Sequence, residues 1–297
     1  MRNLLLLVLL FCISACETYN QDEYQEQYVV ESYQVAGREL AEVRLSTTAS
    51  ASELYKFEDQ AVNHASVKVH LLSGGAGTDV EETFPFTLTG QGTYTTDADH
   101  KILGTRTYML EIDFPDSDEK ITSTTLVPGT YEITETLQDT LIYQSSEQLE
   151  VTLTESQYAG RQSYFVFTSI SLNPVEGNLT PFFLDLYQDE DEDLEYYTKN
   201  SSGIFNKDTY SSNPDGTTTI NYPWIGIAFY RDNLIVSHTI DDNIYDFVRT
   251  QQVQLGGSTI SPGEIQNVFY NMDGGIGIFG SMATDTVGIH IKRGPDF

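Results

Sequence analysis

Alternation of apolar and polar residues is the feature that most constrains the fold of this sequence. In segment 108–114 (YMLEIDF) four apolar side chains occupy one phase, while Glu111 and Asp113 occupy the other. Three earlier segments place these residues in the apolar phase: Ala41, Val43 and Leu45; Ala65, Val67, Val69 and Leu71; Phe84, Phe86 and Leu88. Because successive side chains of a strand point to opposite faces, this period predicts half-buried antiparallel strands.

Turn-forming segments separate these strands and divide the chain. Glycine-rich or aspartate-rich stretches at 73–78, 89–93 and 114–120 lie between strands, as in a β-sandwich. Pro128 and Gly129 interrupt the pattern, and strands resume at 149–153, 163–172, 181–187 (PFFLDLY) and 217–230. Segment 189–215 is polar and predicts a long loop or an extended hairpin. We therefore expect an all-β chain of two β-sandwich domains of Ig-like or Greek-key type, 28–127 and 128–297.

One short helix is expected in the second domain. Segment 239–252 places four apolar residues at helical spacing: Ile240, Ile244, Phe247 and Val248. Thr239 is a plausible N-cap, and Asp241 and Asp242 in the first turn favour the helix dipole. Packing of the apolar stripe on the second domain is the more frequent outcome for such a helix, and a partner-binding helix is the alternative.

A short apolar run that ends at a cysteine opens the sequence. Residues 4–13 are too few to span a bilayer as a helix, which needs about 20 residues, and are typical of a signal peptide. Ile13, Ser14, Ala15 and Cys16 match the bacterial lipobox, in which the chain is cut before a cysteine that receives lipid. We expect residues 1–15 to be removed and Cys16 to anchor the protein to a membrane. The alternative is an ordinary cleaved signal with Cys16 incidental.

Residues 16–27 are expected to form a flexible tether. They contain almost no aliphatic side chains and span at most about 35 Å when extended. Four of their side chains are acidic and resemble the signal that directs Bacteroidota lipoproteins to the cell exterior: Glu17, Asp22, Glu23 and Glu26. The alternative is that this spacer is acidic only because the whole protein is, and the sequence leaves both open.

The charge and cysteine content exclude several classes of protein. Without Arg2, 14 Lys and Arg face 44 Asp and Glu, a net charge of about −30. Such a chain repels phosphate, so nucleic acid is excluded as a partner. Cys12 leaves with the signal and Cys16 is blocked, so we expect no disulfide, no cysteine-bound metal and no cofactor in the mature chain.

Motifs of catalytic or cofactor chemistry are weak here. Segment 275–280 (GIGIFG) has the glycine spacing of a dinucleotide-binding loop but no room for the helix and acid that must follow, so a bend or close strand packing explains its glycines. The five histidines are scattered, and His70 and His290 lie in the polar phase of strands, where surface positions explain them. The sequence has neither HExxH nor GxSxG.

Two further segments have a functional and a structural interpretation. Asp189, Asp191 and Asp193 resemble the opening of a calcium loop, but Leu194 and Asn200 replace the glycine and glutamate that an EF-hand requires, which favours a solvated acidic loop. Segment 220–233 carries four aromatic residues: Tyr222, Trp224, Phe229 and Tyr230. We expect these to lie in the core, with a stacking platform for sugars or proteins as the alternative.

Nine segments follow one another in a recognisable order: CE at 16, YVVESY at 28, VRLSTTAS at 43, HASVKVHL at 64, GTYTTDADHKILGTRTYMLEIDF at 92, ITSTTLVP at 121, VTLTESQYAGRQSYFVF at 151, IYDFVRTQQVQ at 244 and VFYNMDGGIGIFGSM at 268. This order resembles a family of Bacteroidota outer-membrane lipoproteins filed as domain of unknown function 4249. The last segment departs from the family, which tends to have prolines and an Asn-rich turn there.

The resemblance implies a lipid-anchored, all-β accessory protein, often encoded beside a TonB-dependent outer-membrane transporter, and it supplies no catalytic residue. We therefore expect a non-enzymatic binding or accessory lipoprotein of the outer membrane that faces the cell exterior and works with such a transporter in nutrient uptake. The alternatives are a surface glycan hydrolase with paired carboxylates and an adhesin stiffened by calcium. The sequence does not name a ligand or an oligomeric state.

Overall fold

The computed structural model describes residues 24–50, 52–74, 78–136, 139–189, 193–256 and 268–294, so the predicted signal peptide and lipobox lie outside the described residues. The strands are β1 (Tyr28–Val35), β2 (Val43–Thr47), β3 (Ser66–Leu72), β4 (Val80–Gly90), β5 (Thr93–Thr95), β6 (Thr107–Asp113), β7 (Lys120–Leu126), β8 (Ile133–Thr136), β9 (Thr140–Ile142), β10 (Leu149–Leu153), β11 (Tyr164–Ser171), β12 (Lys199–Ser201), β13 (Phe205–Asn206), β14 (Thr218–Tyr222), β15 (Arg231–Ile240) and β16 (Ile276–Lys292). The helices are α2 (Pro181–Asp189), α3 (Asp242–Gly256) and the 3-10 turns η1 (Glu176–Asn178), η2 (Leu194–Thr198), η3 (Lys207–Thr209) and η4 (Trp224–Gly226).

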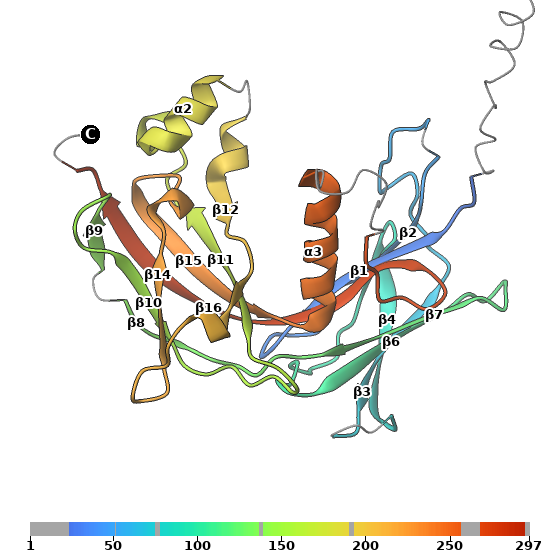
Figure 1. Ribbon diagram of the computed structural model, residues 1–297. Helices are drawn as coiled ribbons and strands as arrows, with labels where there is room; N and C mark the ends of the chain where they lie inside the picture. Colours follow the sequence, from blue (N-terminus) through green and yellow to red (C-terminus); the bar gives the residue numbers. More distant parts are fainter. Residues whose placement is uncertain are drawn as a thin grey trace, which may run out of the picture.

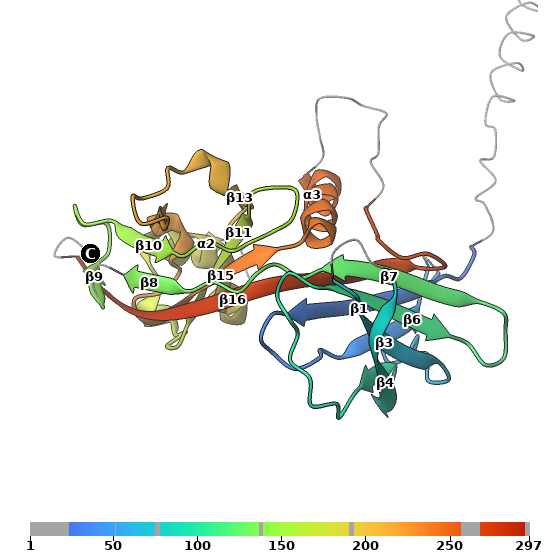
Figure 2. The ribbon, with the colours of Figure 1, turned by 90° about the horizontal axis from the view of Figure 1, so that it is seen from below.

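The long strand β16 connects the two halves of the molecule, the segments before and after Val127 (Figures 1 and 2). Residues 276–282 pair with β1 in parallel, and residues 282–291 pair with β15 in antiparallel register. One sheet therefore runs in the order β12-β11-β15-β16-β1-β2-β5-β4-β3-β6-β7, and a second sheet has the order β14-β10-β8. The all-β prediction is confirmed. The division into two domains near residue 128 stays a prediction.

The pairing of β1 with β16 requires glycine at one position. Gly277 lies opposite Val30 and has a φ of 112°, in a region that side chains disfavour. A Cβ atom at Gly277 would come within 2.0 Å of the Val30 carbonyl oxygen. The predicted role of segment 275–280 in close strand packing is therefore confirmed.

Side chains close the gap between β7, of the first half, and β16, of the second half. The Asn243 side-chain amide donates to the carbonyl oxygens of Thr124 (2.8 Å) and Phe279 (3.1 Å). The Asn271 amide donates to the same two oxygens, at 3.3 and 2.8 Å. Each amide thus bridges one carbonyl of β7 and one of β16.

Asp241 completes this closure from a buried position. Its carboxylate accepts hydrogen bonds from the Thr125 hydroxyl (2.6 Å) and the Ile244 backbone N–H (2.8 Å), and its own N–H donates to the Ser281 carbonyl (3.0 Å). Burial raises the pKa of Asp241 to about 6, although the hydrogen bond from Thr125 opposes this shift. We call Asp241, Asn243 and Asn271 the polar clasp.

The apolar phases found in the sequence mostly form the core. One buried cluster contains residues of both halves, from Val30 to Ile291, and includes Tyr222 and Tyr230. Phe229 is buried in a second cluster, and Trp224 packs partly buried against the first, so the core interpretation of that segment is confirmed. Leu88 was expected inside but is exposed, because it lies near the outer end of the long strand β4.

Two elements differ from the sequence prediction. Segment 181–187, expected as a strand, is the helix α2, with Pro181 in its first position. Its residues Phe183, Leu184, Leu186 and Tyr187 share one helical face and pack with Leu179 and Phe229. Segment 189–215 forms part of α2 and the short elements η2, β12, β13 and η3 rather than a plain loop, because β12 and β13 pair with β11.

The predicted helix exists as α3 but begins later than expected. Thr239 lies inside β15, paired with Phe165 and Ala283, so it is not the N-cap. Asp241 has that role, because its carboxylate accepts the N–H of Ile244. Tyr245, Phe247 and Val248 pack against the sheet around Ile244, as predicted for a docked structural helix. Among the described residues, no helix is both long and apolar enough to cross a membrane.

Candidate functional site at the junction of the two halves

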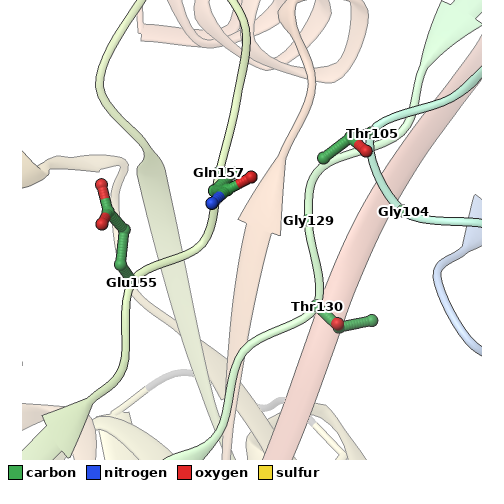
Figure 3. Close-up of a pocket in the computed structure, with 6 residues that line it drawn as sticks. All are labelled: Gly104, Thr105, Gly129, Thr130, Glu155 and Gln157. Carbon is green, nitrogen blue, oxygen red and sulfur yellow. The ribbon is translucent and has the colours of Figure 1, made fainter. Parts of the chain in front are cut away.

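Three connecting segments form the walls of two adjoining hollows where the two halves meet. They join β5 to β6, β7 to β8, and β10 to β11. One hollow, of about 320 Å³, is lined by Gly104, Thr105, Gly129, Thr130, Glu155 and Gln157 (Figure 3). The other, of about 700 Å³, extends from Glu155 to Ser163 and includes Asp208 of η3. Glu155 and Gln157 belong to both hollows, which we together call the junction groove.

The groove depends on close contact between backbone segments. The Gly129 N–H donates to the Gln157 carbonyl at 2.8 Å, and the Ser156 hydroxyl donates to the Gly129 carbonyl at 2.6 Å. A Cβ atom at Gly129 would lie 2.9 Å from the Gln157 nitrogen, so a side chain there would push apart the two connecting segments that contain these residues. Pro128 and Gly129 were predicted only to break the strand pattern, whereas in the structure Gly129 forms part of the groove wall.

An arginine fixed between aromatic rings lies at one end of the groove. The Arg161 guanidinium is 4.0 Å from the Tyr158 ring centroid and 4.1 Å from that of Tyr164. It donates to the Asp242 carboxylate and, at 2.9 Å, to the Ile240 carbonyl. Its charge is therefore balanced where α3 begins, and burial raises the pKa of the neighbouring Tyr158 hydroxyl. Arg161 holds the wall rather than offering a free cation.

The accessible groups of the groove are neutral or acidic. Gln157 is exposed, and the Glu155 carboxylate lies 3.8 Å from the Lys207 ammonium with most of its own surface open to water. Asp208 adds a second carboxylate to the same hollow. Such a lining suits a ligand that exchanges several hydrogen bonds, and its acidity disfavours an anionic one.

The predicted calcium residues are only partly described. Asp189 is the last residue of α2 and Asp193 directly precedes η2, whereas Asp191 lies outside the described residues. In the described part of the chain, no group of three or more His, Cys, Asp or Glu side chains is placed to hold a metal ion. Calcium binding by this segment stays a prediction.

The two histidines expected at the surface have different surroundings. His70 is buried, so that prediction is wrong: β3 lies between β4 and β6, and the neighbouring strands cover its ring. Its Nδ1 atom lies 2.8 Å from the Thr83 hydroxyl, and burial lowers its pKa. His290 is partly exposed, with its Nδ1 atom 2.6 Å from the Asp232 carboxylate, as expected for a surface position.

The predicted anchor lies outside the described residues, but the end of the tether lies within them. The Tyr24 hydroxyl donates to the Thr48 carbonyl, and the Gln27 N–H donates to the Thr48 hydroxyl at 3.1 Å. Residues 24–27 are therefore held against the fold. The prediction of a flexible tether now concerns residues 16–23.

Comparison with known proteins identifies a family but no activity. Residues 17–287 match the family model described as "Domain of unknown function (DUF4249)". No curated protein matches the sequence.

Several solved structures share a distant likeness with the chain. A tetra-tandem repeat in the extending region of a large adhesion protein is 9% identical, with 89% of this chain and 49% of that chain covered and a TM-score of 0.22. Escherichia coli alpha-2-macroglobulin activated by porcine elastase is 9% identical (90% and 23% covered, TM-score 0.24), and the protocadherin gammaB7 EC3-6 cis-dimer is 10% identical (92% and 51%, 0.18). The chain spans about half or less of each, and such TM-scores carry no conclusion about function.

Proposed function

Since the chain belongs to the family described as domain of unknown function DUF4249, we propose that it is a lipid-anchored binding or accessory lipoprotein of the outer membrane. In this proposal the folded part faces the cell exterior and works with a TonB-dependent transporter in nutrient uptake. The observation that carries the proposal is the lipobox Ile13–Cys16 directly after an apolar run. The all-β fold adds support, since loops held by a rigid sheet suit recognition.

The junction groove is the surface that we assign to recognition. Its walls come from both halves, and it offers amide, hydroxyl and carboxylate groups from neighbouring connecting segments. Neither Glu155 nor Gln157 is buried in the core, so both are available to a ligand or a partner. The proposed role requires binding at this groove and no chemical step.

The test of the proposal is extraction of the tagged protein from native outer membranes in gentle detergent, followed by mass spectrometry. A near-stoichiometric transporter barrel is expected. Glu155→Ala combined with Gln157→Ala should weaken its recovery if the groove is the contact, whereas Thr217→Ala, in a separate hollow, should not. A lipoprotein recovered alone under every detergent condition would contradict the proposal.

The anchor itself is tested by a matched pair of cysteine variants. Cys16→Ala should abolish acylation and leave the protein unprocessed or released from the membrane, because it removes the sulfur that receives lipid. Cys12→Ala changes a cysteine of the apolar run and should be processed and acylated normally. Labelling with radioactive palmitate and membrane fractionation distinguish the two. A membrane-bound, fully processed Cys16→Ala protein would refute the anchor.

One observation favours a second candidate, a glycan-acting enzyme. Glu155 and Asp208 line the same hollow, and paired carboxylates are the usual catalytic groups of glycoside hydrolases. Release of reducing sugar from cell-surface glycans, lost in both Glu155→Gln and Asp208→Asn, would establish this activity. Equal release by the wild type and both variants, or no release by the wild type, would rule out this activity.

A further inference from the structure

The chain enters the fold beside the end of β2. Tyr24 and Gln27 both form hydrogen bonds with Thr48, the residue after β2, and the Thr48 N–H donates to the Gln27 carbonyl at 2.9 Å. Tyr28 then pairs with Thr47 as β1 begins. The point where the predicted tether meets the fold is therefore fixed to one end of one strand.

A loop with two exposed apolar side chains starts from the same end of β2. Leu54 is 83% exposed and Tyr55 is 48% exposed, while Tyr24, which directly follows the predicted tether, is 50% exposed. Figure 1 shows this loop, which follows β2, beside the start of β1. The three side chains thus lie around the ends of β2 and of the tether.

Contacts with β2 hold this loop in place. The Tyr55 hydroxyl lies 3.1 Å from the Ser46 hydroxyl of β2, and the Phe57 ring lies 4.1 Å from the Arg44 guanidinium. Leu54, which directly precedes the first of these attachment points, is exposed to water. An apolar side chain that is fixed and almost fully exposed gains free energy from contact with an apolar phase, and tyrosines favour the boundary between lipid and water.

The tether brings this surface close to the bilayer. Eight residue steps separate Cys16 from Tyr24, a reach of at most about 27 Å. A contact that is weak by itself is well occupied when its two surfaces are tethered at such a distance. Lys56 follows Tyr55, but Glu53, Glu58 and Asp59 surround the loop with negative charge. This charge favours zwitterionic over anionic phospholipid.

We propose that Tyr24, Leu54 and Tyr55 form a membrane-contact surface, which docks on zwitterionic phospholipid in the bilayer that holds the acylated Cys16. The inference rests on the proposed lipid anchor and adds an orientation to it. With two points of attachment, the acyl chains and this surface, the folded part stands on the membrane with the end of β2 facing the lipid.

The test uses the full-length lipoprotein reconstituted into phosphatidylcholine vesicles. Leu54→Cys supplies one free thiol in the mature, acylated chain, and this thiol is labelled with a polarity-sensitive fluorophore. Blue-shifted emission and quenching by a nitroxide-labelled lipid are expected. Replacing part of the phosphatidylcholine with phosphatidylglycerol should reduce both signals. Ile225→Cys, at a 57% exposed position in the second half, is the matched control and should keep its emission in water.

Each result decides between the anchor and the contact surface. Vesicle flotation of the labelled protein without a change at position 54 would overturn the contact surface and leave the anchor intact. Failure to float would overturn the anchor, and the surface with it. A shift at position 54 that requires added outer-membrane proteins would assign the loop to a protein partner and overturn the lipid proposal. Leu54→Ser should float with unchanged melting temperature and lose only the docked orientation.

Discussion

Two carboxylates of this protein lie in opposite electrostatic environments. Asp241 belongs to the polar clasp, and Glu111 lies on the solvent-accessible face of β3, β6 and β7. Asp241 is buried and has hydroxyl and N–H donors but, among the described residues, no cation as partner, and burial raises its pKa to about 6. Glu111 accepts hydrogen bonds from Lys120 (2.7 Å) and Lys68 (3.1 Å). The hydrogen bond from Lys120 is the main cause that lowers the pKa of Glu111 to about 2. The comparison separates a carboxylate that orders the fold from one that balances a charged surface.

The difference follows from position in the sheet. Lys68 and Glu111 are directly paired between β3 and β6, and Lys120 lies one strand further on β7, so complementary charges meet on a face that water reaches. Asp241 ends the turn between β15 and α3, where Thr125 and Ser281 cover it. A surface ion pair is worth little because water screens it, whereas loss of a buried hydrogen-bond acceptor leaves its donors without partners.

Asp241→Ala should have the largest effect on stability. It removes the N-cap of α3 and the acceptor of the Thr125 hydroxyl, so we expect a loss of about 3 kcal/mol in the free energy of unfolding. Urea denaturation followed by circular dichroism measures this loss. Asp246→Ala, within the same helix, is the control and should change stability much less. Equal losses in the two variants would remove the special status of the clasp.

The pH dependence of the two regions should have opposite signs. The pKa of Asp241 is higher in the folded than in the unfolded protein, so its contribution is fully present below pH 4 and is lost as pH rises through about 6, a change of up to about 3 kcal/mol. The lowered pKa of Glu111 acts in the other direction, with stability lost as pH falls toward 2. Unfolding free energies between pH 4 and 7 should fall in the wild type relative to Asp241→Asn. A constant difference across this range would contradict the assignment.

Gly129→Ala tests how closely the connecting segments around Gly129 and Gln157 must approach each other. The added Cβ atom would lie 2.9 Å from the Gln157 nitrogen, so the two segments must separate. We therefore expect the free energy of unfolding to fall by about 1–2 kcal/mol. Gly203→Ala is the control, because nothing lies within 4 Å of its Cβ position. Thermal melting measures both. If the Gly129 variant retains full stability, the groove walls can open without cost.

Glu111→Gln should have the smallest effect. Its lysine partners are about one third to one half exposed, so we expect a loss below about 1 kcal/mol that shrinks as salt is added. Urea denaturation at low and at high sodium chloride measures the loss. A salt-independent loss as large as that of Asp241→Ala would show that the comparison between the two regions is wrong.

Local patterns predicted much of the first half. The period-two phases of β2, β3 and β6 became buried faces, since alternation alone decides which side of a strand meets the core. The same pattern failed at Leu88, where β4 pairs with β5 but has passed the end of its pairing with β3, and at His70, which neighbouring strands cover. Position within the sheet, which the local pattern does not contain, decided both.

The candidate site was mostly beyond prediction from sequence. Gly104, Gly129 and Gln157 are far apart in the chain and carry no motif, and only the tertiary structure brings their three connecting segments together. Asp241 was predicted only as a first-turn acid that favours the helix dipole. Its burial depends on Thr125 and Ser281, which lie 116 and 40 residues away in the chain. The glycine of segment 275–280 gave a usable signal, because close strand packing was its expected role.

The sequence by itself determined the all-β class, the helix near residue 244 and the glycines of β16, and it predicts the lipid anchor at Cys16. These follow from patterns within a few residues, such as side-chain period, turn chemistry and the lipobox. Tertiary structure alone decided that segment 181–187 is a helix, that β16 pairs with β1 and β15, and where the groove and the clasp lie. Those outcomes depend on long-range contacts, whose free energy overrides local preference and leaves no local trace in the sequence.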